Sequence, residues 1–228
     1  MPKNFVVIGA SRGIGEAIVK LLAQNKTNSV FAFSRNEEKM LTAFNGLKNV
    51  HVHSLDLNDP NCFGHLSNVV RTIGNVDFMI NNAGTLINKA FHELTHKDLT
   101  ESYQVNVIGV MQSVQAVLPF MNKSHIVNIS SMGGFQGTMK FPGLAAYSTS
   151  KAALCSFTEL FAEEYKETEV KMNCLCLGAV QTEMLEEAFP GYKALLQPEE
   201  MAEYIVDFTI NGGRFMNGKI IPVSLTTP

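Results

Sequence analysis

The chain has 228 residues, of which 46% are apolar and 17% charged, and its formal net charge is -3 at pH 7. This length and apolar content suit one globular domain with a full core, so we expect a single domain over residues 1–228. A mild negative charge without a Lys or Arg cluster argues against partners such as nucleic acid or an anionic membrane and favours a small-molecule ligand. The apolar run at 5–8 is far too short for a signal sequence or a membrane span, so we expect a cytoplasmic protein.

Short runs of β-branched and aromatic residues alternate with longer amphipathic stretches, beginning with a predicted strand at 5–9 and a predicted helix at 13–25. The remaining predicted strands are 29–34, 50–56, 76–82, 125–131, 170–178 and 219–224, and the remaining predicted helices are 37–45, 59–73, 97–120, 145–168 and 198–210. This alternation indicates right-handed crossovers and a doubly wound α/β fold of the Rossmann type, with a mainly parallel seven-stranded sheet covered by helices on both faces. In such sheets ligands bind beyond the carboxyl ends of the strands.

A glycine-rich turn, "GASRGIG", joins the first predicted strand to the first predicted helix with the spacing GxxxGxG. A phosphate group must come close to backbone N–H groups at a helix N-terminus, and a Cβ atom at these positions would obstruct that approach. We therefore interpret the turn as a dinucleotide-binding site, the alternative being an ordinary glycine-rich turn. The candidate contacts are Gly9, Ser11, Arg12, Gly13, Ile14 and Gly15.

The end of the second predicted strand bears on the choice of nucleotide. An acidic residue here would hold the ribose 2′-OH of NAD(H), but Ser34 occupies the position and Arg35 follows it. A carboxylate would repel a 2′-phosphate, whereas Arg35 and Arg12 would attract one. The sequence therefore predicts NADP(H) as cofactor, unless both arginines are solvated surface charges.

The pair Tyr147 and Lys151 in "AAYSTSK" lies four residues apart on a predicted helix, so both side chains project from one face. A phenol with a pKa near 10 is a poor acid or base at neutrality, and a nearby cation lowers that pKa. Such a pair can supply the proton that a carbonyl oxygen needs when hydride reaches its carbon. The YxxxK spacing is also common in helices without any function.

The turn, the YxxxK pair and the "NNAG" that follows the fourth predicted strand together resemble the short-chain dehydrogenase/reductase family, and the motifs occur in the family's order from residue 5 to about 223. By this resemblance Asp56 and Leu57 flank the adenine ring, although Asp56 could instead cap the helix at 59–73. The resemblance also implies nucleotide contacts from Asn82, Ala83 and Gly84.

The same resemblance assigns the catalytic set. Ser131, at the end of "IVNISS", holds the substrate carbonyl beside Tyr147, and Lys151 lowers the pKa of that tyrosine and holds the ribose. Asn106, in "VNVIG", sits at a local break in its helix and joins Lys151 to a proton relay through a water. An amide within an apolar helix needs such a partner because burying it alone costs a few kcal/mol.

"LGAVQT" resembles the family element that contacts the nicotinamide, through Gly178, Val180 and Thr182. Thr182 could equally cap a short helix that begins near Glu183. The chain departs from the family where Ile8 replaces a threonine and where Leu177 replaces a proline that would restrict the backbone.

No metal site is predicted, because the six histidines form no HExxH motif and the four cysteines lack CxxC spacing. Cys174 and Cys176 would share one face of a strand and pack as small apolar side chains.

Together these features predict an NADPH-dependent reductase acting on a small, apolar ketone or aldehyde, the alternative being a non-catalytic NADP(H)-sensing regulator or scaffold. A homodimer or homotetramer that pairs through the helices at 97–120 and 145–168 is implied by the resemblance. The side chains expected to rim the substrate cleft, unless they belong to the core, are Met132, Phe135, Met139, Phe141, Met184 and Leu185.

Overall fold

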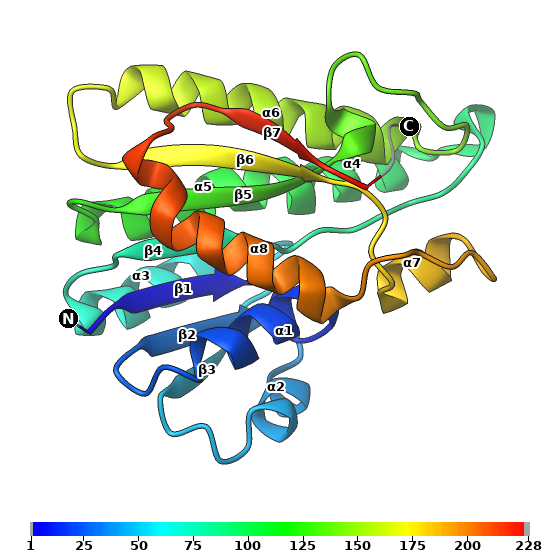
Figure 1. Cartoon of the computed structure of the whole chain (residues 1–228). Coiled ribbons are helices and arrows are strands. Elements are labelled where there is room, and N and C mark those ends of the chain that lie inside the picture. The colour runs from blue at the N-terminus through cyan, green and yellow to red at the C-terminus, as the bar shows by residue number, and fades with distance from the viewer. Residues whose placement is uncertain (1, 226–228) are drawn as a thin grey trace.

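The structure is a computed structural model that describes residues 2–225. Its strands are β1 (Asn4–Ile8), β2 (Ser29–Ser34), β3 (Val50–Ser54), β4 (Phe78–Asn81), β5 (His125–Ser131), β6 (Lys171–Leu177) and β7 (Ile220–Val223). They form a seven-stranded sheet in the order β3-β2-β1-β4-β5-β6-β7, and every neighbouring pair is parallel (Figure 1). The predicted fold class is confirmed, and the sheet is parallel throughout.

The strand order reverses between β1 and β4. The chain passes from β1 outward to β2 and β3, and then returns to the other side of β1 with β4. The crossovers on the two sides leave this point in opposite directions, which opens a crevice at the carboxyl ends of β1 and β4.

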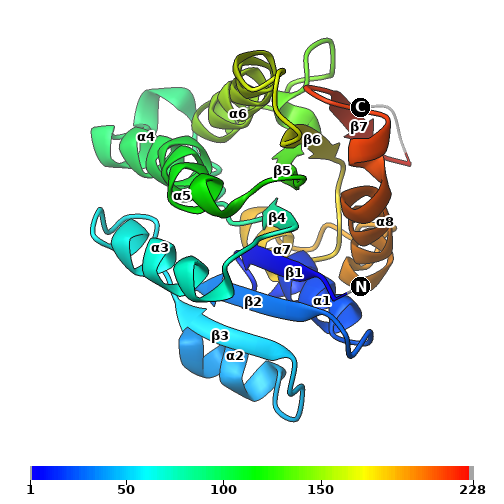
Figure 2. The ribbon, with the colours of Figure 1, turned by 90° about the vertical axis from the view of Figure 1, so that its left-hand side faces the viewer.

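Helices cover both faces of the sheet, as Figure 2 shows. The helices are α1 (Gly13–Leu22), α2 (Glu37–Ala43), α3 (Cys62–Ile73), α4 (His96–Tyr103), α5 (Gly109–Val117), α6 (Ala145–Glu164), α7 (Glu183–Ala188) and α8 (Pro198–Asn211), with 3-10 turns at Phe91–Glu93, Leu118–Phe120, Met132–Gly134 and Gly212–Arg214. Among the described residues, no helix combines the length and the apolar character needed to cross a membrane.

Alternation along β1 illustrates how the two layers are built. Phe5 and Val7 join a core cluster with residues of α1 and α8, whereas Val6 and Ile8 join a second cluster with residues of α3 and α5. Successive side chains of a strand point to opposite faces, so an uninterrupted apolar strand packs against helices on both. Ile8, which stands where the family has threonine, is a core residue here.

The predicted strands are all present, and the differences concern the helices. The helix predicted at 59–73 begins only at Cys62, because Asp56 and Asp59 form turns before it. The stretch 97–120 is divided into α4, a π-helical turn η2 (Gln104–Ile108), α5 and a 3-10 turn. A π-helical turn accommodates an extra residue in a helix, and here it contains Asn106, where the family resemblance implies a break.

Gly15, at the start of α1, tests how tightly the turn between β1 and α1 is packed. A Cβ atom at Gly15 would lie 2.0 Å from the backbone oxygen of Gly9, so Gly15→Ala should lower the free energy of unfolding by about 2 kcal/mol or more, measured by urea denaturation. Gly64 of α3 is the matched control, since nothing lies within 4 Å of its Cβ position, and Gly64→Ala should stabilise the chain by up to about 1 kcal/mol. Equal effects of the two substitutions would contradict this description of the turn.

Candidate active site

A cleft of about 590 Å³ opens at the carboxyl ends of the strands and brings the predicted site residues together. Of the predicted catalytic and cofactor-binding residues, those that line it are Gly9, Ser11, Arg12, Gly13, Ile14, Ser34, Arg35, Asp56, Leu57, Asn82, Ala83, Gly84, Ser131, Tyr147, Lys151, Gly178, Val180 and Thr182. Two predicted residues, Gly15 and Asn106, do not line the cleft and are buried in the protein interior.

The glycine-rich turn is held against the end of β4. Gly9 has a φ of 89°, and a Cβ atom there would lie 2.4 Å from the backbone nitrogen of Ala83. The side-chain amide of Asn82 donates a 2.8 Å hydrogen bond to the Gly9 carbonyl. Only a residue without a side chain fits between these two backbones. The glycine pattern and the "NNAG" motif are therefore two halves of one contact.

The end of β2 forms the outer part of the same half of the cleft. The Ser34 hydroxyl donates to the Ser11 hydroxyl at 2.8 Å, and Arg35 is exposed beside it. Asp56 does not cap α3, because its carboxylate accepts instead from the backbone N–H of Asn58 in a tight turn.

Arg12 is engaged in a contact that the sequence did not reveal. Its guanidinium forms a two-pronged ion pair with Glu187 of α7, and this pairing raises the pKa of Arg12 and lowers the pKa of Glu187. A second ion pair joins α2 to α7, with Lys39 and Glu183 at 3.8 Å. In the structure Arg12 therefore ties α7 to the glycine-rich turn.

Ser131 and Tyr147 form the centre of the other half of the cleft. Ser131 ends β5, and its hydroxyl accepts a 3.2 Å hydrogen bond from the backbone N–H of Gly133. Burial raises the pKa of Tyr147, and a hydrogen bond with Ser131 partly offsets that rise. The net change is a rise, because burial outweighs the Ser131 hydrogen bond, and the expected lowering of the Tyr147 pKa by Lys151 stays a prediction.

Lys151 is a buried cation, with 4% of its surface exposed. Its ammonium lies 6.0 Å from the centre of the Tyr147 ring and donates a 2.8 Å hydrogen bond to the carbonyl oxygen of Ile129. Burial lowers the pKa of Lys151 to about 8. The ammonium is thus held by the backbone of β5 and is only weakly stabilised as a cation.

Asn106 holds the segment after β4 rather than facing the cleft. Its side-chain oxygen accepts from the backbone N–H of Thr85 at 2.9 Å, and its amide donates to the Thr85 carbonyl and the Ser150 hydroxyl. A Cβ atom at Gly84 would lie 3.2 Å from the Lys151 ammonium and 3.3 Å from the Asn106 oxygen. Gly84 therefore permits Lys151 and Asn106 to approach each other.

Thr182 has the capping role that was one of the two sequence-based alternatives. Its hydroxyl accepts a 3.2 Å hydrogen bond from the backbone N–H of Leu185, so Thr182 is the N-cap of α7. A hydroxyl can accept and donate at once, so this cap leaves the Thr182 proton available to a ligand. Leu177, which replaces the family proline, is buried at the end of β6 and paired with Val223.

The apolar wall of the cleft agrees only in part with the sequence-based expectation. Met132, Phe141, Met184 and Leu185 line the cleft. Two expected rim residues do not line it. Met139 is 60% exposed outside the cleft, and Phe135 packs against Cys155, Cys174 and Cys176. The lining residues that sequence reasoning missed include Leu86, Glu101, Val105, Leu144, Phe189 and Tyr192.

None of these missed residues belongs to a recognisable motif, and only their position on elements that end at the cleft could have indicated them.

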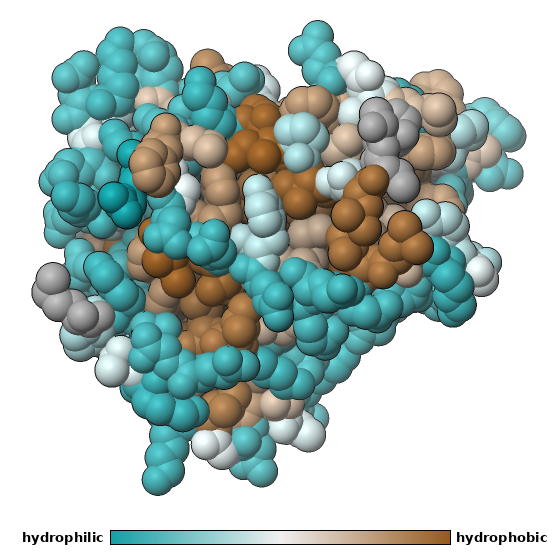
Figure 3. Space-filling view, in the orientation of Figure 1, coloured by the Kyte–Doolittle hydropathy of each residue, from teal (hydrophilic) through white to brown (hydrophobic). Residues whose placement is uncertain are grey.

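Figure 3 shows that apolar side chains gather on the right of this face, around the segment that Figure 1 places between β6 and α8. Leu195 of this segment is 74% exposed. The surface beside α7 is therefore apolar as well.

The histidines form no cluster of ligands in the described part of the chain. His51 and His53 lie on the edge strand β3 and stack on Phe31 at ring-centre distances of 4.7 and 6.5 Å. Their period-two spacing is accounted for by this stacking.

Comparison with known proteins assigns the family. The family model described as short chain dehydrogenase matches residues 3–193. The chain belongs to the short-chain dehydrogenase/reductase family. It is thus an oxidoreductase of a family that binds a nicotinamide cofactor.

Several known proteins are similar to this chain over nearly its whole length. An uncharacterized oxidoreductase of Staphylococcus aureus is 31% identical over 210 residues, which cover 90% of this chain and 89% of the relative. The crystal structure of a short chain dehydrogenase family protein from Francisella tularensis superposes with a TM-score of 0.85 at 23% identity over 98% of both chains. The Pseudomonas aeruginosa RhlG/NADP active-site complex superposes with a TM-score of 0.86 at 25% identity, over 97% of this chain and 94% of that one.

The buried charge of Lys151 should reduce the stability of this short-chain dehydrogenase. The folded-state pKa of about 8 lies below the unfolded value of 10.5, so the unfolded chain binds more protons between these pH values and stability rises with pH across that window. Lys151→Met should therefore stabilise the chain at pH 7 by about 2 kcal/mol, after allowance for the lost hydrogen bond to Ile129. The gain should shrink as the pH rises from 8 to about 10.5.

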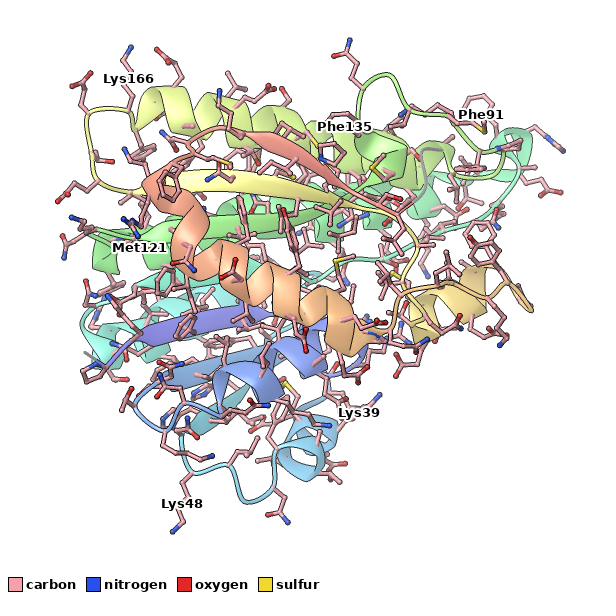
Figure 4. All side chains as sticks on the ribbon, in the orientation of Figure 1. Lys39, Lys48, Phe91, Met121, Phe135 and Lys166 are labelled. Atoms are coloured by element: carbon pink, nitrogen blue, oxygen red, sulfur yellow. The ribbon has the colours of Figure 1, made fainter. Side chains whose placement is uncertain are left out.

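Urea denaturation at several pH values measures this effect. Lys48 is the control, because its side chain points into solvent in Figure 4, and Lys48→Met should change stability by less than about 0.5 kcal/mol. A Lys151→Met protein that is less stable than wild type at pH 7 would show that the ammonium is not an electrostatic cost.

Proposed function

We propose that this chain is an NADPH-dependent oxidoreductase that reduces the carbonyl group of a small, apolar ketone or aldehyde, with Tyr147 as proton donor. The observation that carries the proposal is the shared cleft: Ser131, Tyr147 and Lys151 line one half, and the glycine-rich turn lines the other. A nucleotide held at the turn and a carbonyl held at the hydroxyls would meet in one enclosed space.

The residues of the turn fit a dinucleotide. α1 begins at Gly13, and Gly13 and Ile14 line the cleft, so the N-terminus of this helix would present its backbone N–H groups to a phosphate. Asn82, Ala83 and Gly84 would hold the nucleoside from the other side, and Gly178, Val180 and Thr182 would hold the nicotinamide end. When bound, the reduced cofactor supplies a hydride.

The chain's own residues manage the proton. A raised pKa keeps the phenol of Tyr147 protonated at neutral pH, as a proton donor to a developing alkoxide must be. The Ser131 hydroxyl, which shares a hydrogen bond with Tyr147, can direct a carbonyl oxygen towards the phenol. Lys151, still largely protonated at pH 7 with a pKa of about 8, adds positive charge beside the ring. A protonated phenol is the form that reduction of a carbonyl requires.

The preference for NADP(H) is supported by three features. Ser34 leaves the end of β2 without a carboxylate that would repel a 2′-phosphate. Arg35 lines the cleft beside it, whereas Arg12 is paired with Glu187. The RhlG complex, whose fold superposes over nearly the whole chain, contains NADP. We therefore propose Arg35 as the main partner of the 2′-phosphate.

The proposed substrate and assembly rest on apolar surfaces. Met132, Phe141, Met184 and Leu185 would contact the substrate, which favours an apolar carbonyl compound. We also propose a homodimer or homotetramer formed through the α4–α5 and α6 surfaces, where Ile108 and Leu160 are exposed. Leu154 and Phe161 of α6 do not contribute to that surface, because they are buried within the chain.

Replacing the phenol tests the proton donor. Tyr147→Phe should bind NADPH as wild type does and lower kcat by about 10²–10⁴-fold, because it removes only the transferable proton. The measurement is NADPH oxidation with ketones, aldehydes, quinones and 3-oxoacyl thioesters, alongside NADPH binding by fluorescence. Tyr192→Phe, which removes a hydroxyl from another part of the same cleft, is the control and should leave kcat little changed.

Two results would contradict the proposed function. Near wild-type turnover in Tyr147→Phe would exclude the phenol as proton donor. A wild-type protein that binds NADPH but reduces none of these carbonyl classes would instead favour a regulator or scaffold.

Arg35 tests the cofactor preference. Arg35→Ser should weaken NADPH binding about tenfold or more and leave NADH binding unchanged, because it removes a charged contact to the 2′-phosphate alone. Arg12→Ser should have a smaller effect, since Glu187 already engages that guanidinium. Wild-type affinities for NADPH and NADH within about threefold of each other would overturn the preference, being less than 1 kcal/mol apart.

A further inference from the structure

Three cysteines that lie far apart in the sequence meet beneath the cleft. Cys155 lies on α6, one turn after Lys151 and on the same buried face, and Cys174 and Cys176 project from one face of β6. The Cys155 sulfur lies 3.5 Å from the Cys176 sulfur and 4.0 Å from the Cys174 sulfur. All three sulfurs lie within 4.8 Å of one another, and all three residues are buried. We call these residues the thiol cluster.

The spacing of the thiol cluster matches that of three sulfurs around one ion. Thiolates bind zinc at about 2.3 Å, which places sulfurs that share an ion roughly 3.8–4.0 Å apart in tetrahedral or trigonal geometry. The Cys155 sulfur lies 3.5 and 4.0 Å from its two neighbours, and these separations span the expected values. The thiols could therefore accommodate an ion through small side-chain rotations, without movement of α6 or β6.

The surroundings of the thiol cluster suit the charge of such a complex. Three thiolates and one divalent ion carry a net charge of -1, and a buried charge is tolerated only beside a partner. Lys151 is that partner, since it lies one helical turn before Cys155 among the buried residues of α6, and the three cysteines act to raise its pKa against the effect of burial. The Ser130 hydroxyl accepts from the Cys155 thiol at 3.5 Å and donates to the Lys151 carbonyl at 2.9 Å, and it could donate to a Cys155 thiolate by exchanging that second bond. A monovalent ion would leave a second negative charge unpaired.

One side of the thiol cluster is closed by residues that are only partly buried. Met132, Phe135 and Ile220 pack against the cysteines. Figure 4 labels Phe135 near the upper surface of the molecule, where β7, the 3-10 turn at Met132–Gly134 and α6 meet. Met132 and Phe135 begin the long irregular stretch before α6, whose displacement would give an ion access from solvent.

We propose that Cys155, Cys174 and Cys176 form a three-thiolate binding site for a divalent thiophilic ion of the Zn²⁺ and Cd²⁺ class. On binding, three metal–sulfur bonds form, every cysteine of the cluster that still carries its thiol proton releases it to solvent, and no electron is transferred. The bound ion joins α6 to β6 directly below Lys151. The site shares Lys151 with the proposed reductase, but the inference does not depend on the reductase activity.

Cadmium titration of the purified full chain under reducing conditions tests the site, because Cd²⁺ thiolates absorb in the ultraviolet. We expect saturation at one Cd²⁺ per chain and the release of about two to three protons per ion at neutral pH, because hydrogen bonds from Cys174 and Cys176 lower the pKa of the Cys155 thiol. Replacing any one of the three cysteines by serine should weaken Cd²⁺ binding at least about tenfold and remove about a third of the absorbance. Cys62→Ser is the control and should change neither, since Cys62 is a buried cysteine on α3, outside the cluster.

A second measurement needs no substitution and remains valid if a serine variant fails to fold. X-ray absorption of the Cd²⁺- or Zn²⁺-loaded wild-type chain counts the sulfur neighbours of the ion, and we expect three. Fewer than three sulfurs, an equal loss of binding in Cys62→Ser, or binding that occurs only together with loss of helical circular dichroism would overturn the proposal. The last result would mean that the ion binds thiols of the unfolded chain.

Discussion

The contact between the glycine-rich turn and the end of β4 is the constraint on which the cleft depends. Gly9 touches the backbone at Ala83, and the Asn82 amide closes the contact with a hydrogen bond to the Gly9 carbonyl. This contact holds β1 and β4 together where the strand order reverses. A side chain between the two backbones would separate them and would displace the start of α1 from the cleft.

A second constraint is the buried face of α6. Tyr147, Lys151 and Cys155 follow one another at intervals of four residues, so one helix face presents a phenol, an ammonium and a thiol to β5 and β6. The phenol reaches the open cleft, the ammonium is held by the carbonyl of Ile129, and the thiol meets the cysteines of β6. The catalytic candidate and the thiol cluster thus lie at successive depths along a single face.

Burial has opposite consequences for the two ionisable groups of that face. It raises the pKa of the Tyr147 phenol and lowers the pKa of the Lys151 ammonium, because the interior disfavours the charged form of each. The phenol is thereby kept as a proton donor, and the ammonium is kept close to losing its charge. A stable fold would not by itself select a buried lysine, so its presence is better explained by chemistry at the cleft.

The sequence by itself determined the strands, most of the helices, the fold class and nearly all of the cleft lining that belongs to motifs. Strand and helix periodicity is local, and a glycine or a YxxxK pair is recognisable wherever its neighbours lie in the chain. Only the tertiary structure decided that Arg12 forms an ion pair with Glu187 and that Phe135 and Met139 lie outside the cleft. It also decided that burial raises the pKa of Tyr147 and that Cys155 lies against the cysteines of β6. Each of these depends on contacts between residues distant in the chain or on exclusion of water, and neither quantity is contained in the spacing of residues along one element.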